Sequence, residues 1–192
     1  MSLILFGSHS SPFVRRIRLF MEGMDYQFRT VNIFEASDRE HFRTISPIKK
    51  LPVLQEGDQL VFDSHVIYQY LRQKKGLPAA SLEESNQVSV IDAILDSSVT
   101  LLLATRSELP VAEDRLLFRL QRERLPDSFE WLNREASRGA FDVWHYGTMC
   151  LIAMMDWLAF RALSGAEGYP ALQAVRQRHE ARPIVQATMP KG

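Results

Sequence analysis

The pattern of apolar residues changes once along the chain, and this change constrains the fold more than any other feature. Over residues 1–75, short runs typical of strands alternate with stretches that repeat at helical spacing. From Glu83 onward the strand-like runs disappear, and apolar residues recur every three or four positions. This organisation predicts an α/β domain followed by an all-α domain.

In the first third, the expected order is strand, helix, strand, an irregular or helical stretch, hairpin and helix. Short apolar or β-branched runs bounded by glycine predict the strands. A glycine-containing turn between two such runs is typical of a hairpin. The expected strands are 3–6, 26–31, 52–55 and 59–62, and the expected helices cover 13–21 and the residues that follow Asp63-Ser64.

Residues 76–85, which contain Gly76 and Pro78, form the expected linker between a domain at 1–75 and a helical domain at 86–192. Pro126 makes the continuity of the second long helix in the helical domain doubtful. The segment 149–163 is apolar nearly all round, which indicates a buried central helix. Pro183 is expected to end the last helix.

The charge balance limits the classes of partner. The chain has 192 residues, with 23 Lys and Arg against 23 Asp and Glu, so its formal net charge is zero. Nucleic acids and anionic membranes both favour a basic surplus, so neither is expected as a partner. Cys150 is the single cysteine and cannot form an internal disulfide. Since no cluster of Cys and His has metal-ligand spacing, we expect neither a metal nor a prosthetic group.

We expect a cytoplasmic protein without a membrane span. The longest strictly apolar run covers residues 149–155, whereas a span needs about 20 residues. Residues 1–6 lack a basic region and are too short for the apolar part of a signal peptide.

Three short segments could carry chemistry, and the first is the turn at 7–13. Pro12 suits the first turn of a helix, which places Ser11 close to the N-cap. Ser11 then either simply caps the helix or helps the helix N-terminus to stabilise an anion such as a thiolate. His9 is the only nearby base and does not stand in line with Ser11, so a serine nucleophile is not expected.

The other two segments contain Leu51-Pro52 and Asp63-Ser64. A proline at the start of a strand removes a hydrogen-bond donor, and a cis Leu51–Pro52 bond is one explanation. Lys49-Lys50 is either a solvated pair or a counter-charge for a carboxylate. Asp63-Ser64 precedes a helix, where capping and the binding of a ligand carboxylate and ammonium explain it equally well.

Together, and in this order, the three segments resemble the glutathione transferase family, which joins an N-terminal thioredoxin-like domain to an all-helical domain. Residues 11–15, Ser-Pro-Phe-Val-Arg, are similar to the family's serine-type active-site turn. Residues 46–54 are similar to the family's Asn-Pro-hydrophobic-Gly-Lys-Val-Pro-Val-Leu segment, and Asp63-Ser64 resembles its Glu-Ser or Asp-Ser pair. The resemblance covers essentially the whole chain.

The resemblance implies a role for each matching residue. Ser11 falls on the catalytic serine that donates a hydrogen bond to the glutathione thiolate. The implied glutathione-binding residues are Phe13, Lys50 near the glycyl carboxylate, the backbone of Leu51 before a cis Pro52, and Asp63 and Ser64 at the γ-glutamyl end. Arg106 is a candidate for the electrophile site, although a solvated or paired arginine explains it as well.

Two departures from the family pattern are visible. Lys49 replaces a glycine, so the loop before Pro52 is expected to differ and Lys49 could itself reach the ligand. The capping-box aspartate expected after His145 is replaced by Thr148, so we expect Thr148 or Asp142 to cap the central helix. Cys150, inside that helix, is interpreted as a small core residue.

The resulting hypothesis is a cytoplasmic glutathione transferase, with glutathione as co-substrate and an electrophilic or hydrophobic small molecule as second substrate. The resemblance also implies a homodimer and a role in detoxification. The alternative is a non-catalytic binding or regulatory protein with the same fold.

Overall fold

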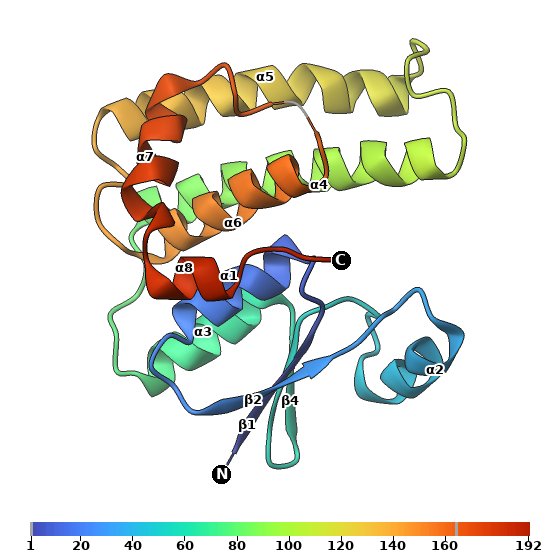
Figure 1. The fold of residues 1–192 in the computed structure, drawn as a ribbon, viewed down its shortest axis with the longest axis vertical. Coiled ribbons are helices and arrows are strands. Elements are labelled where there is room, and N and C mark those ends of the chain that lie inside the picture. Colours follow the sequence, from blue (N-terminus) through green and yellow to red (C-terminus); the bar gives the residue numbers. More distant parts are fainter. Residues whose placement is uncertain (1, 164) are drawn as a thin grey trace. The chain divides into compact units, whose positions relative to one another are not determined.

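The chain folds into two compact units in the computed structural model, which describes residues 2–163 and 165–192. One unit comprises Met1–Ala79 together with Arg182–Gly192, and the other comprises Ala80–Ala181 (Figure 1). The division lies within the expected linker 76–85. The chain end at 182–192, which the sequence analysis assigned to the helical domain, is part of the first unit.

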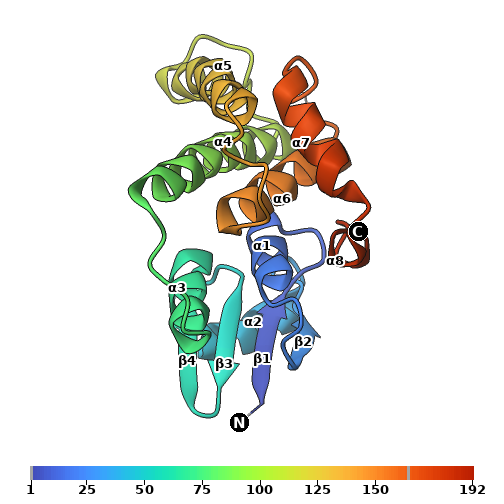
Figure 2. The ribbon, with the colours of Figure 1, turned by 90° about the vertical axis from the view of Figure 1, so that its left-hand side faces the viewer.

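The first unit is a thioredoxin-like domain built on a four-stranded sheet, as expected. The strand order is β2-β1-β3-β4 (Figure 2), with β1 parallel to β2 and the other two pairs antiparallel. Helices α1 and α3 lie on one side of the sheet and α2 on the other (Figure 1). The elements are β1 (Leu3–Gly7), α1 (Pro12–Phe20), β2 (Tyr26–Thr30), α2 (Ala36–Ile45), β3 (Val53–Glu56), β4 (Gln59–Phe62), α3 (Ser64–Lys74) and α8 (Pro183–Ala187).

The apolar periodicity of the first unit explains its core. Leu5 on β1 and Leu54 on β3 face each other in the sheet register and are fully buried. Ile17 on α1 and Ile67 on α3 are fully buried as well, because each lies on the apolar stripe of its helix. These two central strands and two helices form the base from which the neighbouring loops project.

The second unit is all helical, with α4 (Leu82–Arg106), α5 (Leu116–Ser137), α6 (Tyr146–Phe160) and α7 (Pro170–Glu180). Helix α4 packs against both α5 and α6, and α7 packs against α5 and α6. Residues from Tyr146 to Leu158 of α6 are all buried, as its all-round apolar sequence predicts. Cys150 is among them, which confirms that it is a core residue.

Pro126 behaves differently from the prediction, and Pro183 has a second role besides the predicted one. Helix α5 continues through Pro126, because its packing against α4 and α7 holds the helix where one backbone N–H is missing. Pro183 not only follows α7 but also begins α8, where it occupies the first helical turn and its missing N–H has no cost.

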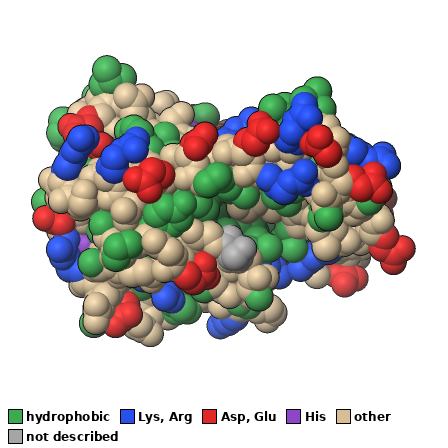
Figure 3. Space-filling view, turned by 90° about the horizontal axis from the view of Figure 1, so that it is seen from above, with side chains coloured by type: hydrophobic (Ala, Val, Ile, Leu, Met, Phe, Trp, Pro, Cys, Tyr) green, Lys and Arg blue, Asp and Glu red, His purple; other side chains and the backbone are tan. Residues whose placement is uncertain are grey.

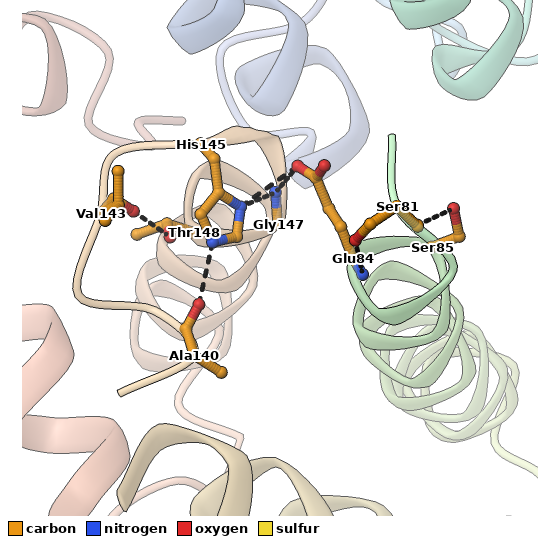
Figure 4. Close-up of polar contacts among 8 residues, drawn as sticks. All are labelled: Ser81, Glu84, Ser85, Ala140, Val143, His145, Gly147 and Thr148. Atoms are coloured by element: carbon orange, nitrogen blue, oxygen red, sulfur yellow. Dashed lines mark hydrogen bonds and ion pairs between the residues drawn. The ribbon is translucent and has the colours of Figure 1, made fainter. Parts of the chain in front are cut away.

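The predicted cap of α6 was wrong. Thr148 donates its hydroxyl to the carbonyl of Val143 (2.7 Å), and Asp142 pairs with Arg178. The backbone N–H of Gly147 donates instead to Nδ1 of His145 (3.1 Å) and to Oε1 of Glu84 (3.2 Å), as Figure 4 shows. One of the two caps therefore comes from α4, a helix distant in sequence.

Helix α4 is the one described helix that is long and apolar enough to cross a membrane by length and composition, and less than half of its apolar window is buried. The core helix of a globular protein passes the same test, so this finding is weak evidence for a span.

Seen from above, the surface carries side chains of both charges, and apolar side chains gather around a central hollow (Figure 3).

Candidate functional site

The register of the sheet brings the three predicted segments to one edge. Phe6, near the end of β1, pairs with Val53 at the start of β3, and Val53 pairs with Phe62 at the end of β4. The turn after β1, the loop before β3 and the residues after β4 therefore leave the sheet at the same edge. Loops at one edge of a rigid sheet are a common place for a binding site.

Ser11 is the N-cap of α1. Its backbone is extended and its Oγ accepts a hydrogen bond from the N–H of Val14 (3.3 Å), while Pro12 occupies the first helical position. The capping bond uses a lone pair of the hydroxyl and not its proton. Since the Ser11 hydroxyl donates to no atom in residues 2–163 and 165–192, its proton is available to a ligand. Capping and anion binding are therefore compatible at this residue.

The loop before β3 contains a cis Leu51–Pro52 peptide bond, as the resemblance implies. Lys49 has a φ of 52°, in the left-handed region that favours glycine. A lysine therefore occupies a backbone conformation that favours glycine. The expectation that this loop differs from the family's stays a prediction.

The lysines of this loop are exposed cations. The ammonium groups of Lys49 and Lys50 make no hydrogen bond or ion pair with any described part of the chain. The backbone N–H and C=O of Leu51 likewise form no backbone hydrogen bond within that part. This loop thus offers two positive charges beside an unused donor and acceptor, which suits an anionic peptide.

Asp63 caps α3 by accepting a hydrogen bond from the N–H of His65 at Oδ1 (2.7 Å). It has a φ of 69°, which a residue with a side chain rarely adopts. Its second carboxylate oxygen makes no hydrogen bond within the described residues and points to no internal partner. The adjacent Ser64 is buried, with 1% of its surface exposed.

Arg16 is a residue of this region that the sequence analysis did not assign. Its side chain is 1% exposed, and Nη2 donates to Oγ of Ser64 at 2.6 Å. Its guanidinium also lies over the ring of Phe13, 5.0 Å from the centroid. Arg16 therefore connects two segments predicted to bind the same ligand. The several arginines that follow Ser11 could have indicated that one of them serves the site. Sequence alone does not show which arginine points inward.

The neighbouring Arg15 serves the chain end instead. It is 2% exposed and donates to the carbonyl of Val185 (3.2 Å) and to Oγ1 of Thr188 (3.4 Å). Val185 and Thr188 are themselves buried. The contacts explain why residues 182–192 belong to the first unit.

His9, the only base near Ser11, is half-buried against Phe28, with 5.0 Å between the ring centroids. Burial lowers the pKa of His9, and the charges of Arg18 and Lys191 lower it further. His9 is therefore neutral at pH 7. A neutral imidazole adds no positive charge to the turn that carries Ser11.

Arg106, the candidate for the electrophile site, is the last residue of α4 in the helical unit and is exposed.

Within residues 2–163 and 165–192, no group of three or more His, Cys, Asp and Glu is arranged to hold a metal ion.

Residues 5–79 match the family described as glutathione S-transferase, N-terminal domain. The chain carries a glutathione S-transferase N-terminal domain. A search of relatives gives 26% identity to the uncharacterised GST-like protein YibF of Escherichia coli, over 83% of this chain and 84% of YibF. A glutathione S-transferase of Triticum aestivum is 38% identical, over 37% of this chain and 33% of the wheat protein.

Solved structures extend the likeness from this glutathione S-transferase domain to the whole chain. A glutathione S-transferase of Methylobacillus flagellatus, with glutathione bound, aligns with a TM-score of 0.86 and 18% identity, covering 99% of this chain and all of the other. A glutathione transferase family member of Pseudomonas fluorescens, with S-(propanoic acid)-glutathione bound, gives 0.82 and 22%, with 99% and 100% covered. The chain therefore has the glutathione transferase fold.

Proposed function

We propose that this protein is a glutathione transferase of the serine type, which binds glutathione along its first unit and conjugates it to an electrophilic small molecule. The observation that carries the proposal is the Ser11 hydroxyl, which caps α1 with its oxygen and keeps its proton for a ligand. The glutathione S-transferase domain and the glutathione bound in structures of the same fold support the identity of that ligand.

The chemistry needed at Ser11 is modest. A free thiol has a pKa of about 8.5, and lowering it to about 7 requires roughly 2 kcal/mol. A hydrogen bond to a charged acceptor contributes about 1.5–3 kcal/mol. The N-terminus of α1 adds a favourable field for an anion. The Ser11 proton and the helix therefore supply enough stabilisation to keep the glutathione sulfur as a thiolate at neutral pH.

The polar ends of glutathione match the groups at the same sheet edge. In this proposal, Lys50, with Lys49 beside it, attracts the glycyl carboxylate, and the unused backbone groups of Leu51 pair with the cysteinyl residue. The γ-glutamyl carboxylate lies at Ser64 and the N-terminus of α3, and the second oxygen of Asp63 accepts from the ammonium. Phe13, held under Arg16, forms an apolar wall.

The remaining features of the hypothesis stay proposals: a homodimer, a cytoplasmic location, a role in detoxification and a contribution of Arg106 to the electrophile site. The exposed apolar residues on α4 and at the start of α5, including Leu103, Leu116 and Leu117, are consistent with a partner subunit.

The test compares Ser11→Ala with wild type in glutathione binding by calorimetry and in conjugation to a generic aromatic halide. Loss of the hydrogen bond to the thiolate is expected to lower turnover at least about 10-fold, while glutathione affinity is largely kept. Because Ser11→Ala also removes a helix cap, Ser81→Ala is the matched control. Ser81 caps α4 by accepting from the N–H of Glu84 (3.0 Å), and its variant should lose stability but not turnover.

Two outcomes contradict the proposal. A wild-type protein that neither binds glutathione nor turns over is not a transferase. Binding without turnover against a panel of electrophiles would instead support the non-catalytic alternative, in which Ser11 only caps α1.

A further inference from the structure

The imidazole of His9 is held against an aromatic ring by a guanidinium. Its centroid lies 5.0 Å from that of Phe28 on β2, and its Nδ1 lies 3.4 Å from Nη1 of Arg18 on α1. The guanidinium of Arg18 in turn lies over the Phe28 ring, 4.6 Å from the ring centroid. Three side chains from three separate segments of the first unit therefore contact one another pairwise.

These contacts fix the protonation state of the imidazole. A guanidinium can only donate, so Nδ1 of His9 accepts the hydrogen bond from Arg18, and the proton of the neutral ring is on Nε2. The charges that act on His9 are those of Arg18 on α1 and of Lys191 in the chain end, while Phe28 on β2 carries none. Burial and these two cations lower the pKa of His9. The acceptor at Nδ1 is therefore present at neutral pH and is lost in acid.

His9 lies in the turn that ends at Ser11. The N–H of Ser11 donates to the carbonyl of Ser8 at 3.4 Å, so His9 and Ser10 are the two central residues of this turn. That backbone hydrogen bond is long, and the hydroxyls of Ser8 and Ser10 add no hydrogen bond within residues 2–163 and 165–192. The His9 side chain therefore anchors the centre of the turn to β2 and to α1.

The packing beneath the turn couples this anchor to Ser11. A Cβ on Gly7, just before the turn, would lie 2.4 Å from Cγ1 of Val14 and 3.1 Å from Cε2 of Phe28. The Phe28 ring thus packs closely against the backbone at the start of the turn, and the His9 ring packs on the same Phe28. Movement of His9 would shift the turn, and with it the Ser11 Oγ that accepts from the N–H of Val14 at 3.3 Å.

We propose that His9 is a positioning residue for Ser11 and that a proton taken up by its imidazole releases the turn. A protonated ring offers no acceptor to Arg18, and two cations then face each other beside Phe28. The stabilisation of the turn is complete above the unfolded pKa of histidine, about 6.5, and is lost as the pH falls through the lowered folded pKa of His9. The effect on turnover rests on the proposed transferase function, whereas the effect on the turn does not.

Nuclear magnetic resonance of the full chain without ligand tests the state of the imidazole. The ring-nitrogen signals of His9, assigned by their absence in His9→Asn, should show an unprotonated Nδ1 and a protonated Nε2 at neutral pH. The pKa of His9 should lie below its ordinary value, and Arg18→Met should raise it because one of the two cations is gone. A proton on Nδ1 in neutral wild type would overturn the proposal.

Amide hydrogen exchange tests the effect on Ser11 without any substrate. The N–H of Val14, which donates to Ser11 Oγ, should exchange at least about 5-fold faster in His9→Ala than in wild type at neutral pH. His9→Asn keeps an acceptor but does not titrate, so wild type should lose protection at Val14 relative to this variant as the pH falls from about 7 to about 5. The N–H of Glu84, held by Ser81 in the same kind of cap, is the control and should exchange equally in all three proteins at each pH. Unchanged exchange of Val14 in His9→Ala would overturn the proposal.

Steady-state kinetics tests the consequence for the proposed reaction. At neutral pH, His9→Ala should lower kcat at least about 5-fold with KM for glutathione nearly unchanged, and His9→Asn should restore most of kcat. His41→Gln, which replaces an exposed histidine of α2 in the same unit, is the matched control and should keep the activity of wild type. A wild-type kcat in His9→Ala would reject the positioning role. If wild type itself has no turnover, the transferase proposal fails, but the resonance and exchange measurements still decide the role of His9.

Discussion

At the scale of single residues, Arg15 and Arg16 show how adjacent, equally buried arginines can serve different parts of the protein. Both are at most 2% exposed, but Arg15 donates to the chain end and Arg16 donates to Ser64. Since an arginine can only donate, the Ser64 oxygen accepts this bond and is held in one orientation. Arg16 is thus a positioning residue for the proposed γ-glutamyl site.

Replacing Arg16 by lysine should therefore weaken glutathione binding through Ser64. We expect KM for glutathione in Arg16→Lys to rise about 10-fold, with kcat at saturating glutathione nearly unchanged, since a charge-assisted hydrogen bond is worth about 1.5–3 kcal/mol. Steady-state kinetics with varied glutathione measures both constants.

Arg15→Lys is the matched control for this prediction. It likewise replaces a planar guanidinium by an ammonium, at an equally buried neighbour. It should lower the melting temperature without changing KM for glutathione. An equal rise of KM in both variants would show that general destabilisation, and not the orientation of Ser64, causes the effect.

Local sequence patterns predicted several structural features of the candidate site and missed others for a physical reason. The N-cap at Ser11, the cap at Asp63 and the cis bond before Pro52 each depend on neighbouring residues and a local motif. The role of Arg16 depends on which way a side chain turns in the folded core and on a serine 48 positions away.

At the scale of elements, the start of α6 depends on α4. Nδ1 of His145 and Oε1 of Glu84 both accept a hydrogen bond from the N–H of Gly147, and these two atoms lie 3.1 Å apart (Figure 4). Nε2 of His145 donates to the carbonyl of Ala140 (2.9 Å). Neutral His145 caps Gly147 through Nδ1, whereas protonated His145 donates to Glu84 and leaves the cap to the carboxylate.

This arrangement predicts a pH-dependent stability. Burial on its own lowers the pKa of His145, but the hydrogen bonds to Glu84 and Ala140 outweigh it and raise the pKa. The hydrogen bond from His145 lowers the pKa of Glu84. The stabilisation from His145 is therefore complete below its unfolded pKa of about 6.5 and is lost as the pH rises through its raised folded pKa. The stabilisation from Glu84 is lost only in acid, as the pH falls through its lowered folded pKa.

The measurement is the melting temperature of wild type and Glu84→Gln between pH 5.5 and pH 8.5. Wild type should exceed the variant by about 2–4 °C at the acid end, for a contribution near 1 kcal/mol, and the difference should shrink toward pH 8.5. His179 and the Asp142–Arg178 pair nearby are unchanged in the variant, so they cancel in the comparison. A difference that stays constant with pH would contradict the ion pair.

The element-scale predictions failed where distant packing decides the outcome. The strands, the hairpin and the apolar helices follow from periodicity, which is a local property. The continuity of α5 through Pro126 depends on α4 and α7, and the cap of α6 depends on a carboxylate from α4. Neither partner is visible from the residues beside the proline or the cap.

At the scale of the whole molecule, the chain end is part of the first unit and should contribute to its stability. Thr188→Val replaces the hydroxyl that accepts from Arg15 and donates to the carbonyl of Ile184 (2.7 Å), while keeping the shape of the side chain. We expect a loss of about 1–3 kcal/mol in the free energy of unfolding, because the buried Arg15 loses an acceptor and the carbonyl of Ile184 loses a donor.

Urea unfolding of wild type and Thr188→Val measures this loss. Thr105→Val is the matched control, since the Thr105 hydroxyl is exposed and only donates to the carbonyl of Leu101 within its own helix (2.9 Å). Equal and small losses in both variants would show that the chain end adds little to the first unit.

The first unit is built from two separate segments of the sequence, and this has a consequence for its synthesis and folding. Its residues come from two separate stretches of the chain, and residues 80–181 are inserted between them. A ribosome makes the sheet of this unit before residues 80–181, but it makes α8 and the acceptors of Arg15 after them. The helical unit has all its residues earlier and can complete its packing while the unit begun before it still waits for its final segment. Expression of residues 1–79 alone would therefore yield a unit that lacks part of its own core.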